Sequence, residues 1–389
     1  MIPNFLPKPL LLLALAHLVT DLSQGALPML LPSLKTALDL SYMQIGVIVL
    51  VQNVTSSIIQ PLFGVITDKT SLPWLLPLSV FLSGLGMSIT GFMPTYFFVL
   101  LSVIVGGLGV AGFHPQASKS VHFVSPDVIK GRSMGIFSVG GNLGMAIGAA
   151  FMMLLITLPG SLHNTIWFLI PGSITALLLW RNLSQVSPQS FDRGGKSSGT
   201  KKKAVIWSPL LLLLFFIFFR STLHAGLSTY IPMYYVNYLN GSPVYAGYML
   251  SLFLAGGAVG TFVGATLSDR FGRKTIITFS MLIVLPLVIL LPFTNGIATM
   301  VLLTFTGFTL ISSFATTLVL AQEMMPGYEG MASGLTIGFT IGLGGVGVTI
   351  LGYIADLYGV PSVFTVLSTL PVVGGLLSLF LPGRLLQRD

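Results

Sequence analysis

Stretches of roughly 20 apolar residues, each long enough to cross a hydrocarbon core about 30 Å thick, follow one another along the chain with short polar interruptions. They extend from Pro9 to Leu381. Because a bilayer offers no water to unpaired backbone groups, such stretches are expected to be helices. The pattern predicts an all-α membrane protein with twelve transmembrane helices, near residues 9–33, 43–67, 73–94, 96–118, 132–158, 163–181, 205–238, 244–267, 275–293, 297–321, 331–354 and 361–382.

The composition agrees with a membrane location. Of the 389 residues, 53% are hydrophobic and 7% are charged, whereas soluble domains carry about 25% charged residues. The first apolar stretch, Pro9 to Leu34, is too long for the apolar core of a signal peptide and lacks a small-residue cleavage site. We therefore expect it to remain as the first transmembrane helix.

Several kinds of chemistry are not expected from this sequence. There are 0 cysteines, which excludes disulfides, thiolate metal sites and nucleophilic thiols. The sequence shows no phosphate-binding GxxxxGK[ST] motif, metal-ligand pattern or nucleophile constellation. We therefore expect neither an enzyme nor an ATP-driven pump, and no cofactor or metal.

The net charge of +8 would suit nucleic acid, but the positions of the basic residues indicate membrane topology instead. With a cytoplasmic N-terminus, Lys35 alone falls outside and Arg220 falls within a span. The other sixteen of the 18 basic residues fall on the cytoplasmic side: Lys8, Lys69, Lys119, Lys130, Arg132, Arg181, Arg193, Lys196, Lys201, Lys202, Lys203, Arg270, Arg273, Lys274, Arg384 and Arg388. This distribution predicts a multi-pass protein of the cytoplasmic (inner) membrane with both termini in the cytoplasm.

The chain is expected to consist of two similar halves. Residues 182–204 form the only long polar run and are expected to be a cytoplasmic linker between six-helix halves at 1–181 and 205–389. A motif at the end of the second span, Gly64 to Lys69, recurs at the end of the eighth, Ala265 to Lys274. Duplicated helical halves are typical of alternating-access transporters, whose substrate site lies between the halves.

The Asp269 to Lys274 run resembles the signature loop of the major facilitator superfamily, and the likeness covers the whole chain. In a physical interpretation, Asp269 accepts hydrogen bonds at a helix end while Arg273 holds a carboxylate from a neighbouring helix, and this latch breaks when the cytoplasmic side opens. The alternative is that the charges only set topology. The residues assigned to the latch are Asp68, Lys69, Asp269, Arg270, Gly272, Arg273 and Glu323, with a weaker copy at Asp68 because no Gly-Arg-Lys tail follows it.

A closer resemblance is to the fosmidomycin resistance proteins, a branch of drug efflux carriers. It rests on motifs in order along the chain: His17 to Asp21, Met43 to Gly46, Gln60-Pro61, Thr67 to Lys69, Phe113 to Pro115, Gly140 to Gly144 and Gln322-Glu323. The resemblance implies export of a small amphipathic or anionic compound in exchange for protons. The Gly-rich fifth span lies where antiporters of the superfamily carry a Gly-rich motif, but Asn142 stands in place of the usual proline, and ordinary helix packing explains the glycines equally well.

Ionisable side chains within a span are costly and so are candidates for function. Asp21 is the one carboxylate placed deep in a span, and His17 lies one turn before it on the same helical face. We expect Asp21 to exchange protons, with His17 and His114 as relay groups. Arg220 and His224 form a basic pair in the seventh span, where Arg220 either binds an anionic substrate or holds Asp21 charged.

Polar and aromatic side chains elsewhere in the spans are candidates for lining a substrate cavity. They are Asn53, Gln60, Asn142 and Tyr234, the last with membrane-interface packing as its alternative. The sequence thus predicts a monomeric, proton-coupled antiporter that exports a small drug-like or anionic compound, in contact with membrane lipid and with no nucleic acid partner. A proton symporter that imports a metabolite or nutrient is the alternative.

Overall fold

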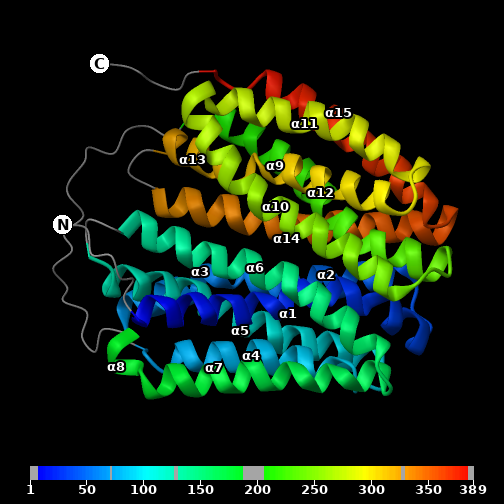
Figure 1. Ribbon diagram of the computed structural model, residues 1–389. Helices are drawn as coiled ribbons and strands as arrows, with labels where there is room; N and C mark the ends of the chain where they lie inside the picture. The colour runs from blue at the N-terminus through cyan, green and yellow to red at the C-terminus, as the bar shows by residue number, and fades with distance from the viewer. Residues whose placement is uncertain (1–7, 71, 127–129, 187–205, 326–328, 384–389) are drawn as a thin grey trace. The chain divides into compact units, whose positions relative to one another are not determined.

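The computed structural model describes residues 8–70, 72–126, 130–186, 206–325 and 329–383. Over these ranges the regular secondary structure is helical, without strands. Eleven helical segments are long and apolar enough to cross a membrane, and a shorter apolar helix, α4 (Leu75–Thr90), takes the place of the third expected span. The all-α membrane fold expected from the sequence is confirmed (Figure 1).

The chain divides into two compact units, residues 1–40 with 51–195 and residues 41–50 with 196–389. Helix α2 (Tyr42–Asn53) contributes residues to both. Besides α4, the first unit contains α1 (Lys8–Leu38), η1 (Val54–Ile58), α3 (Gln60–Lys69), α5 (Tyr96–Val124), α6 (Lys130–Thr157), η3 (Ser161–Phe168), α7 (Leu169–Arg181) and α8 (Leu183–Val186). The second contains α9 (Trp207–Met233), η4 (Tyr234–Tyr238), α10 (Pro243–Phe271), α11 (Arg273–Leu290), η5 (Leu291–Phe293), α12 (Ile297–Ile311), α13 (Phe314–Met324), α14 (Glu329–Tyr358) and α15 (Pro361–Leu379).

The same pair of helices packs together in each half of the chain. In the first half, α1 lies alongside α6, and in the second, α9 lies alongside α14 (Figure 1). These are the first and fifth spans of each half. The repeated pairing is the structural form of the internal repeat seen in the sequence.

Glycines let α1 and α6 touch along their backbones. Three glycines on α6 stand against successive turns of α1, where an added Cβ would overlap backbone oxygens; the pairs are Gly140 with Ala14, Gly144 with Leu18, and Gly148 with Leu22. Such small faces are the usual means of close helix approach in membranes. The contact fixes the polar residues of α1 against α6.

The second expected span is interrupted by a π-helical turn. Pro61 has no N–H for the carbonyl of Ser57, one turn earlier. Just before this point, the Thr55 hydroxyl donates to the carbonyls of Val51 at 2.8 Å and Gln52 at 3.0 Å. A missing donor and a competing side-chain donor explain why η1 (Val54–Ile58) replaces regular α-helix here.

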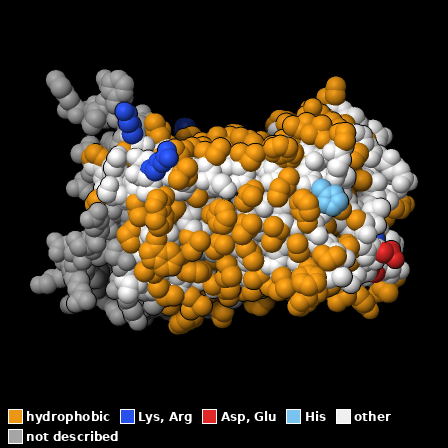
Figure 2. Space-filling view, turned by 90° about the horizontal axis from the view of Figure 1, so that it is seen from below, with side chains coloured by type: hydrophobic (Ala, Val, Ile, Leu, Met, Phe, Trp, Pro, Cys, Tyr) orange, Lys and Arg blue, Asp and Glu red, His pale blue; other side chains and the backbone are white. Residues whose placement is uncertain are grey.

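The outer surface carries a broad apolar band. Figure 2 shows hydrophobic side chains over the middle of one face, with Lys and Arg towards one end and acidic and His side chains towards the other. On α7, for example, Ile174, Leu177 and Trp180 are exposed. Exposed apolar surface of this extent suits contact with lipid rather than water.

Candidate functional site

A buried acid on α1 is the centre of the polar cluster in the first unit. Asp21 is 6% exposed and His17 is 8% exposed. They lie one helical turn apart, and His17 Nε2 is 3.2 Å from Asp21 Oδ2. The i,i+4 spacing in the sequence places the two side chains on one face of α1, as expected.

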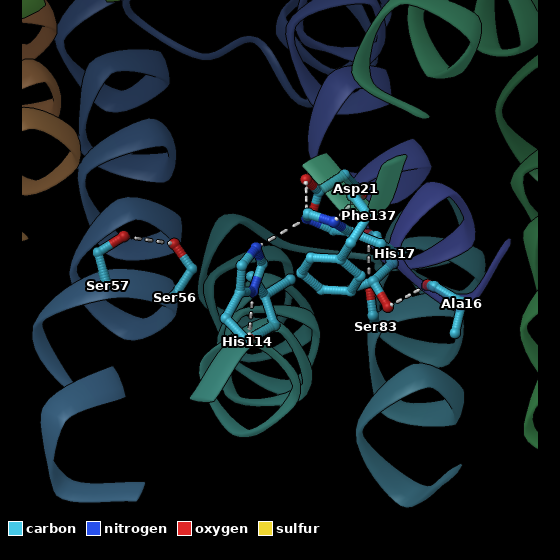
Figure 3. A network of polar contacts seen from close by, with 10 residues as sticks. Ala16, His17, Asp21, Ser56, Ser57, Ser83, His114 and Phe137 are labelled. Atoms are coloured by element: carbon cyan, nitrogen blue, oxygen red, sulfur yellow. Dashed lines mark hydrogen bonds and ion pairs between the residues drawn. The ribbon is translucent and has the colours of Figure 1, made fainter. Parts of the chain in front are cut away.

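A second histidine reaches the same acid from α5. His114 Nε2 is 3.5 Å from Asp21 Oδ1, so each carboxylate oxygen faces one imidazole (Figure 3). The rings of His17 and His114 meet edge to face, with centroids 5.1 Å apart. The structure therefore brings together all three residues expected to handle protons.

Backbone carbonyls orient both imidazoles. His17 Nδ1 lies 2.7 Å from the carbonyl oxygen of Phe137 on α6, and His114 Nδ1 lies 3.0 Å from that of Val110. A carbonyl only accepts, so each Nδ1 carries a proton and donates it. In both rings Nε2 is then the nitrogen that gains or loses a proton, and in both rings it faces Asp21.

Protons between these atoms decide the charge of the cluster. With no proton on either Nε2 or on Asp21, two nitrogen lone pairs would face a carboxylate at 3.2 Å and 3.5 Å, which is repulsive. One proton relieves one contact, and a second relieves the other. The arrangement has the chemistry of a site that takes up and releases protons.

Apolar groups cover one side of the cluster, whereas the His114 side chain is 26% exposed. The ring of Phe137 stacks on His17 with centroids 4.1 Å apart, and Phe113 lies 5.8 Å from the same ring. On the α6 side, a Cβ at Gly141 would overlap the His17 ring and come within 2.7 Å of Asp21 Oδ2. One glycine of the Gly-rich fifth span thus leaves room for the His–Asp pair, beyond its packing role.

Metal-ligand chemistry was not expected, yet His17, Asp21 and His114 hold one nitrogen or oxygen each within 4.8 Å of one another. The same atoms are close enough to share protons, with His17 Nε2 3.2 Å from Asp21 Oδ2 and His114 Nε2 3.5 Å from Asp21 Oδ1.

A small cavity lies beside the cluster, between α1, α2, α4 and α5. Gln24, one turn after Asp21, lines it with Ser23, Gln52, Ser83, Gly86, Met87, Thr90, Val103, Gly106 and Val110. The Ser83 hydroxyl donates to the Thr20 carbonyl at 2.9 Å and links α4 to α1. The side chains of Ser23, Gln24, Gln52, Ser83 and Thr90 give this largely apolar cavity polar groups that a water molecule can bind.

Arg220 is the buried cation of the second unit. It is 1% exposed, its Nη2 donates to Thr340 Oγ1 at 3.3 Å, and its guanidinium lies 5.2 Å from the centre of the Phe314 ring. Nη1 is buried without a hydrogen-bond partner in the described ranges, and no described carboxylate pairs with the guanidinium. A buried charge without a counter-ion is costly, and an anion would offset that cost.

The remaining candidate ligand residues are spread over α9, η4, α2, α3 and α6. His224 is one turn after Arg220 on α9 and stacks on Phe253, with centroids 5.4 Å apart. Tyr234 begins η4 and stacks on Tyr238 at 5.3 Å. Three further candidates are partly exposed: Asn53 at the end of α2, Gln60 at the start of α3, and Asn142 on α6.

The proposed latch forms contacts in the second unit. Arg273, the first residue of α11, bonds the Asp269 carboxylate and donates to Ser268 Oγ at 2.8 Å. Its Nε lies 3.5 Å from Glu323 Oε1 on α13. Gly272 has φ +92° and makes the turn between α10 and α11, a conformation that glycine adopts without strain.

Arg270 makes a different contact. The Arg270 guanidinium lies over the ring of Phe271, 5.3 Å from its centre. The side chains of Asp68 and Lys69 lie outside the described residues.

Some polar partners had no signal in the sequence. The carbonyls of Phe137 and Val110 are backbone groups, which sequence reasoning does not pair. Thr340 and Phe314 lie far from Arg220 along the chain. Asp356 accepts hydrogen bonds from the backbone N–H groups of Tyr42 and Met43 at the start of α2. It lies two residues beyond the predicted end of the eleventh span.

In a comparison with known protein families, the sequence model of the Major Facilitator Superfamily matches residues 13–346 of this chain.

Relatives match over nearly the whole chain. The chain is 34% identical over 378 residues to the fosmidomycin resistance protein of Escherichia coli (strain K12), covering 96% of this chain and 92% of that protein. It is 33% identical over 381 residues to the uncharacterized MFS-type transporter YfnC of Bacillus subtilis (strain 168), with the same coverage. Among solved structures, the nucleoside transporter NupG superimposes with a TM-score of 0.77 at 12% identity, covering 96% of this chain and 100% of that one.

Proposed function

The chain belongs to the Major Facilitator Superfamily, and on that premise we propose that it is a proton-coupled antiporter that exports a small anionic or drug-like compound. The family consists of membrane transporters of small molecules rather than enzymes. The observation that carries the proposal is the buried acid of α1 with an imidazole on each oxygen. It is supported by the buried Arg220, which has no carboxylate partner among the described residues.

The proton site in this proposal is Asp21 with His17 and His114. Because each Nδ1 is held by a carbonyl, the two Nε2 atoms and the carboxylate share the exchangeable protons. Proton uptake changes the charge of a group buried in the first unit, and burial makes that change energetically significant. The protonated and deprotonated forms of the site therefore favour different conformations of the protein. Coupling to a proton gradient requires such a difference.

The substrate site in this proposal includes Arg220. A guanidinium with a free Nη1 binds carboxylate or phosphonate oxygens through charge-assisted hydrogen bonds. The Phe314 ring beneath it offers an apolar surface to the rest of a ligand. We assign His224, Asn53, Gln60, Asn142 and Tyr234 as further candidate substrate contacts.

We base the proposed direction of transport on the name of one relative. The fosmidomycin resistance protein bears the name of the compound it protects against, and a transporter protects a cell by export. Proton entry then drives compound exit. A symporter with the same proton site would import its substrate.

In this proposal, the latch residues stabilise one conformational end state of the transport cycle. Arg273 joins Asp269 of α10 and Glu323 of α13 at the start of α11, and opening on that side breaks these contacts. Arg270, Gly272, Asp68 and Lys69 belong to the same proposal. We further propose a monomer in the cytoplasmic membrane, with both termini in the cytoplasm and halves at 1–181 and 205–389 joined by 182–204.

Purified protein in sealed vesicles tests the proposal. Vesicles are loaded with a labelled anionic antimicrobial, fosmidomycin first, and given a proton gradient of either direction. Efflux that accelerates when external protons enter, with loss of that gradient in step with efflux, supports antiport. Accumulation in the direction of proton flow would instead show symport, and movement that ignores the gradient would contradict proton coupling.

A further inference from the structure

The first turn of α2 is bound by an acid from the far end of the chain. The backbone N–H groups of Tyr42 and Met43 donate to the two carboxylate oxygens of Asp356, at 2.7 Å and 2.9 Å. Asp356 lies in the last turn of α14. Helix starts leave four N–H groups without helical partners, and a carboxylate satisfies them while opposing the positive end of the helix dipole.

The other two N–H groups of this turn are satisfied locally. Gln44 N–H donates to Ser41 Oγ at 3.1 Å, and Ser41 N–H donates back to Gln44 Oε1 at 2.9 Å, which forms a capping box. Ile45 N–H donates to the Ser41 carbonyl at 3.1 Å. Residues Ser41 and Gln44 therefore start the helix on their own, and Asp356 adds a second, distant cap.

Glycines bring the same segment against α14. A Cβ at Gly46 would lie 2.6 Å from Thr349 Cα, and one at Gly345 would lie 2.7 Å from Leu50 Cα. Near the Asp356 end, a Cβ at Gly352 would overlap the backbone of Tyr42 and Met43. Residues 41–50 are accordingly part of the second unit.

The remainder of this span belongs to the first unit. Gly107 of α5 leaves room for the Thr55 side chain, where a Cβ would overlap it. Between the two ends lies the π-helical turn η1 (Val54–Ile58). One transmembrane span is thus held at its start by the second unit and at its end by the first.

We infer that Asp356 is a releasable cap that stabilises one conformation of the transport cycle. Alternating access moves the two halves of such a transporter, so a span held by both must be freed at one end. The contact with α14 suits release, because it consists of smooth glycine faces and of two N–H groups and a carboxylate that water can solvate. The capping box keeps the first turn of α2 helical after release.

Asp356 is a positioning residue in this inference and touches neither the substrate nor the proton site. The inference rests on alternating access but not on the substrate or the coupling ion. A conformational readout without substrate or gradient therefore tests it separately from the proposed function.

Site-directed labelling provides that readout, because the chain has 0 cysteines. Val49→Cys places one thiol at a buried position in the third turn of α2, beyond the reach of fraying at Tyr42. Val49 lies one turn after Gly46, which packs on Thr349 of α14, so the rate at which a maleimide labels it reports how often this face of residues 41–50 becomes accessible. Asp356→Asn should raise that rate roughly two- to fivefold, the factor implied by losing a carboxylate at a helix N-terminus.

Ser41→Ala is the matched control, since it weakens the local cap in every conformation and should leave the rate at residue 49 unchanged. Asp356→Glu keeps the charge, and its labelling rate should lie near that of wild type. This variant takes the place of Asp356→Asn if Asp356→Asn does not fold. For folded protein, an unchanged rate in Asp356→Asn, or an equal rise in Ser41→Ala, would overturn the inference and leave Asp356 as a fixed structural cap.

Discussion

His114 Nε2 on α5 lies 3.5 Å from Asp21 Oδ1 on α1, while the other oxygen of the same carboxylate faces His17. Two histidines 97 positions apart thus share one acid within the first unit. An acid with two imidazoles holds a proton differently from an acid alone, and each member can be tested by substitution.

Asp21→Asn removes the exchangeable charge while keeping the size of the side chain. We expect the variant to insert and to bind ligand, but to lose concentrative transport and the proton release that accompanies ligand binding. Gradient-driven flux in vesicles should fall by more than tenfold, with ligand affinity measured in parallel. Asp39→Asn, at an exposed position with φ 49° that asparagine tolerates, is the control and should transport normally. Uphill pumping by Asp21→Asn near the wild-type rate would show that another group carries the proton.

His114→Gln keeps an amide donor near Asp21 but removes one protonation site. If both imidazoles share the exchangeable protons, this variant should release fewer protons on ligand binding than wild type, and ligand affinity should change little. A pH-indicator dye in weak buffer measures the release. His122→Gln, on the same helix but exposed, should match wild type. Unchanged release in His114→Gln would leave Asp21 and His17 as the whole proton site.

Gly141→Ala tests the space that α6 leaves for the His–Asp pair. The added methyl would overlap the His17 ring, so we expect lower thermal stability and impaired transport. Gly135→Ala on the same helix meets nothing within 4 Å and should change stability by no more than about 0.5 kcal/mol. Melting of the purified protein compares the two, and equal behaviour would argue against close packing at Gly141.

Arg220→Ala should weaken binding of an anionic ligand by roughly ten- to hundredfold, the range for losing a hydrogen bond to a charged group. Arg220→Lys keeps the charge but loses the planar fork, and we expect an intermediate affinity. Equilibrium binding of the same antimicrobial used in the vesicle assay measures both. If both variants bind like wild type, the buried guanidinium has a structural role.

Arg273→Ala removes the centre of the latch. Turnover should fall much more than the amount of folded protein, because one end state loses its ion pairs. Adding Glu323→Gln to Arg273→Ala should cost little more than either change alone if the pair acts as a unit. Additive losses would indicate independent roles, and parallel loss of expression and turnover would favour a purely structural contact.

The spans and the internal repeat follow from the sequence because hydrocarbon imposes a length and a composition on every crossing segment. The His17–Asp21 pair was predictable from its i,i+4 spacing, and His114 was expected as a further relay group for the same acid. The π-helical turns were not predicted, since Val54 to Ile58 lies inside the single span expected at 43–67 and the break depends on Pro61 and on the hydroxyl of Thr55. The carbonyls that orient the imidazoles, and the partners of Arg220, depend on tertiary packing that periodicity does not encode.

The contact between Tyr42 and Asp356 has a consequence for biogenesis. The two residues are 314 positions apart, so at about 5–20 residues per second the ribosome needs roughly 15 to 60 seconds to make the partner of a helix start already in the bilayer. During that interval the glycine face of residues 41–50 has no α14 to pack against. The nascent N-terminal half is therefore a folding intermediate with an unpaired helix face, open to lipid or to a membrane chaperone until the eleventh span is inserted.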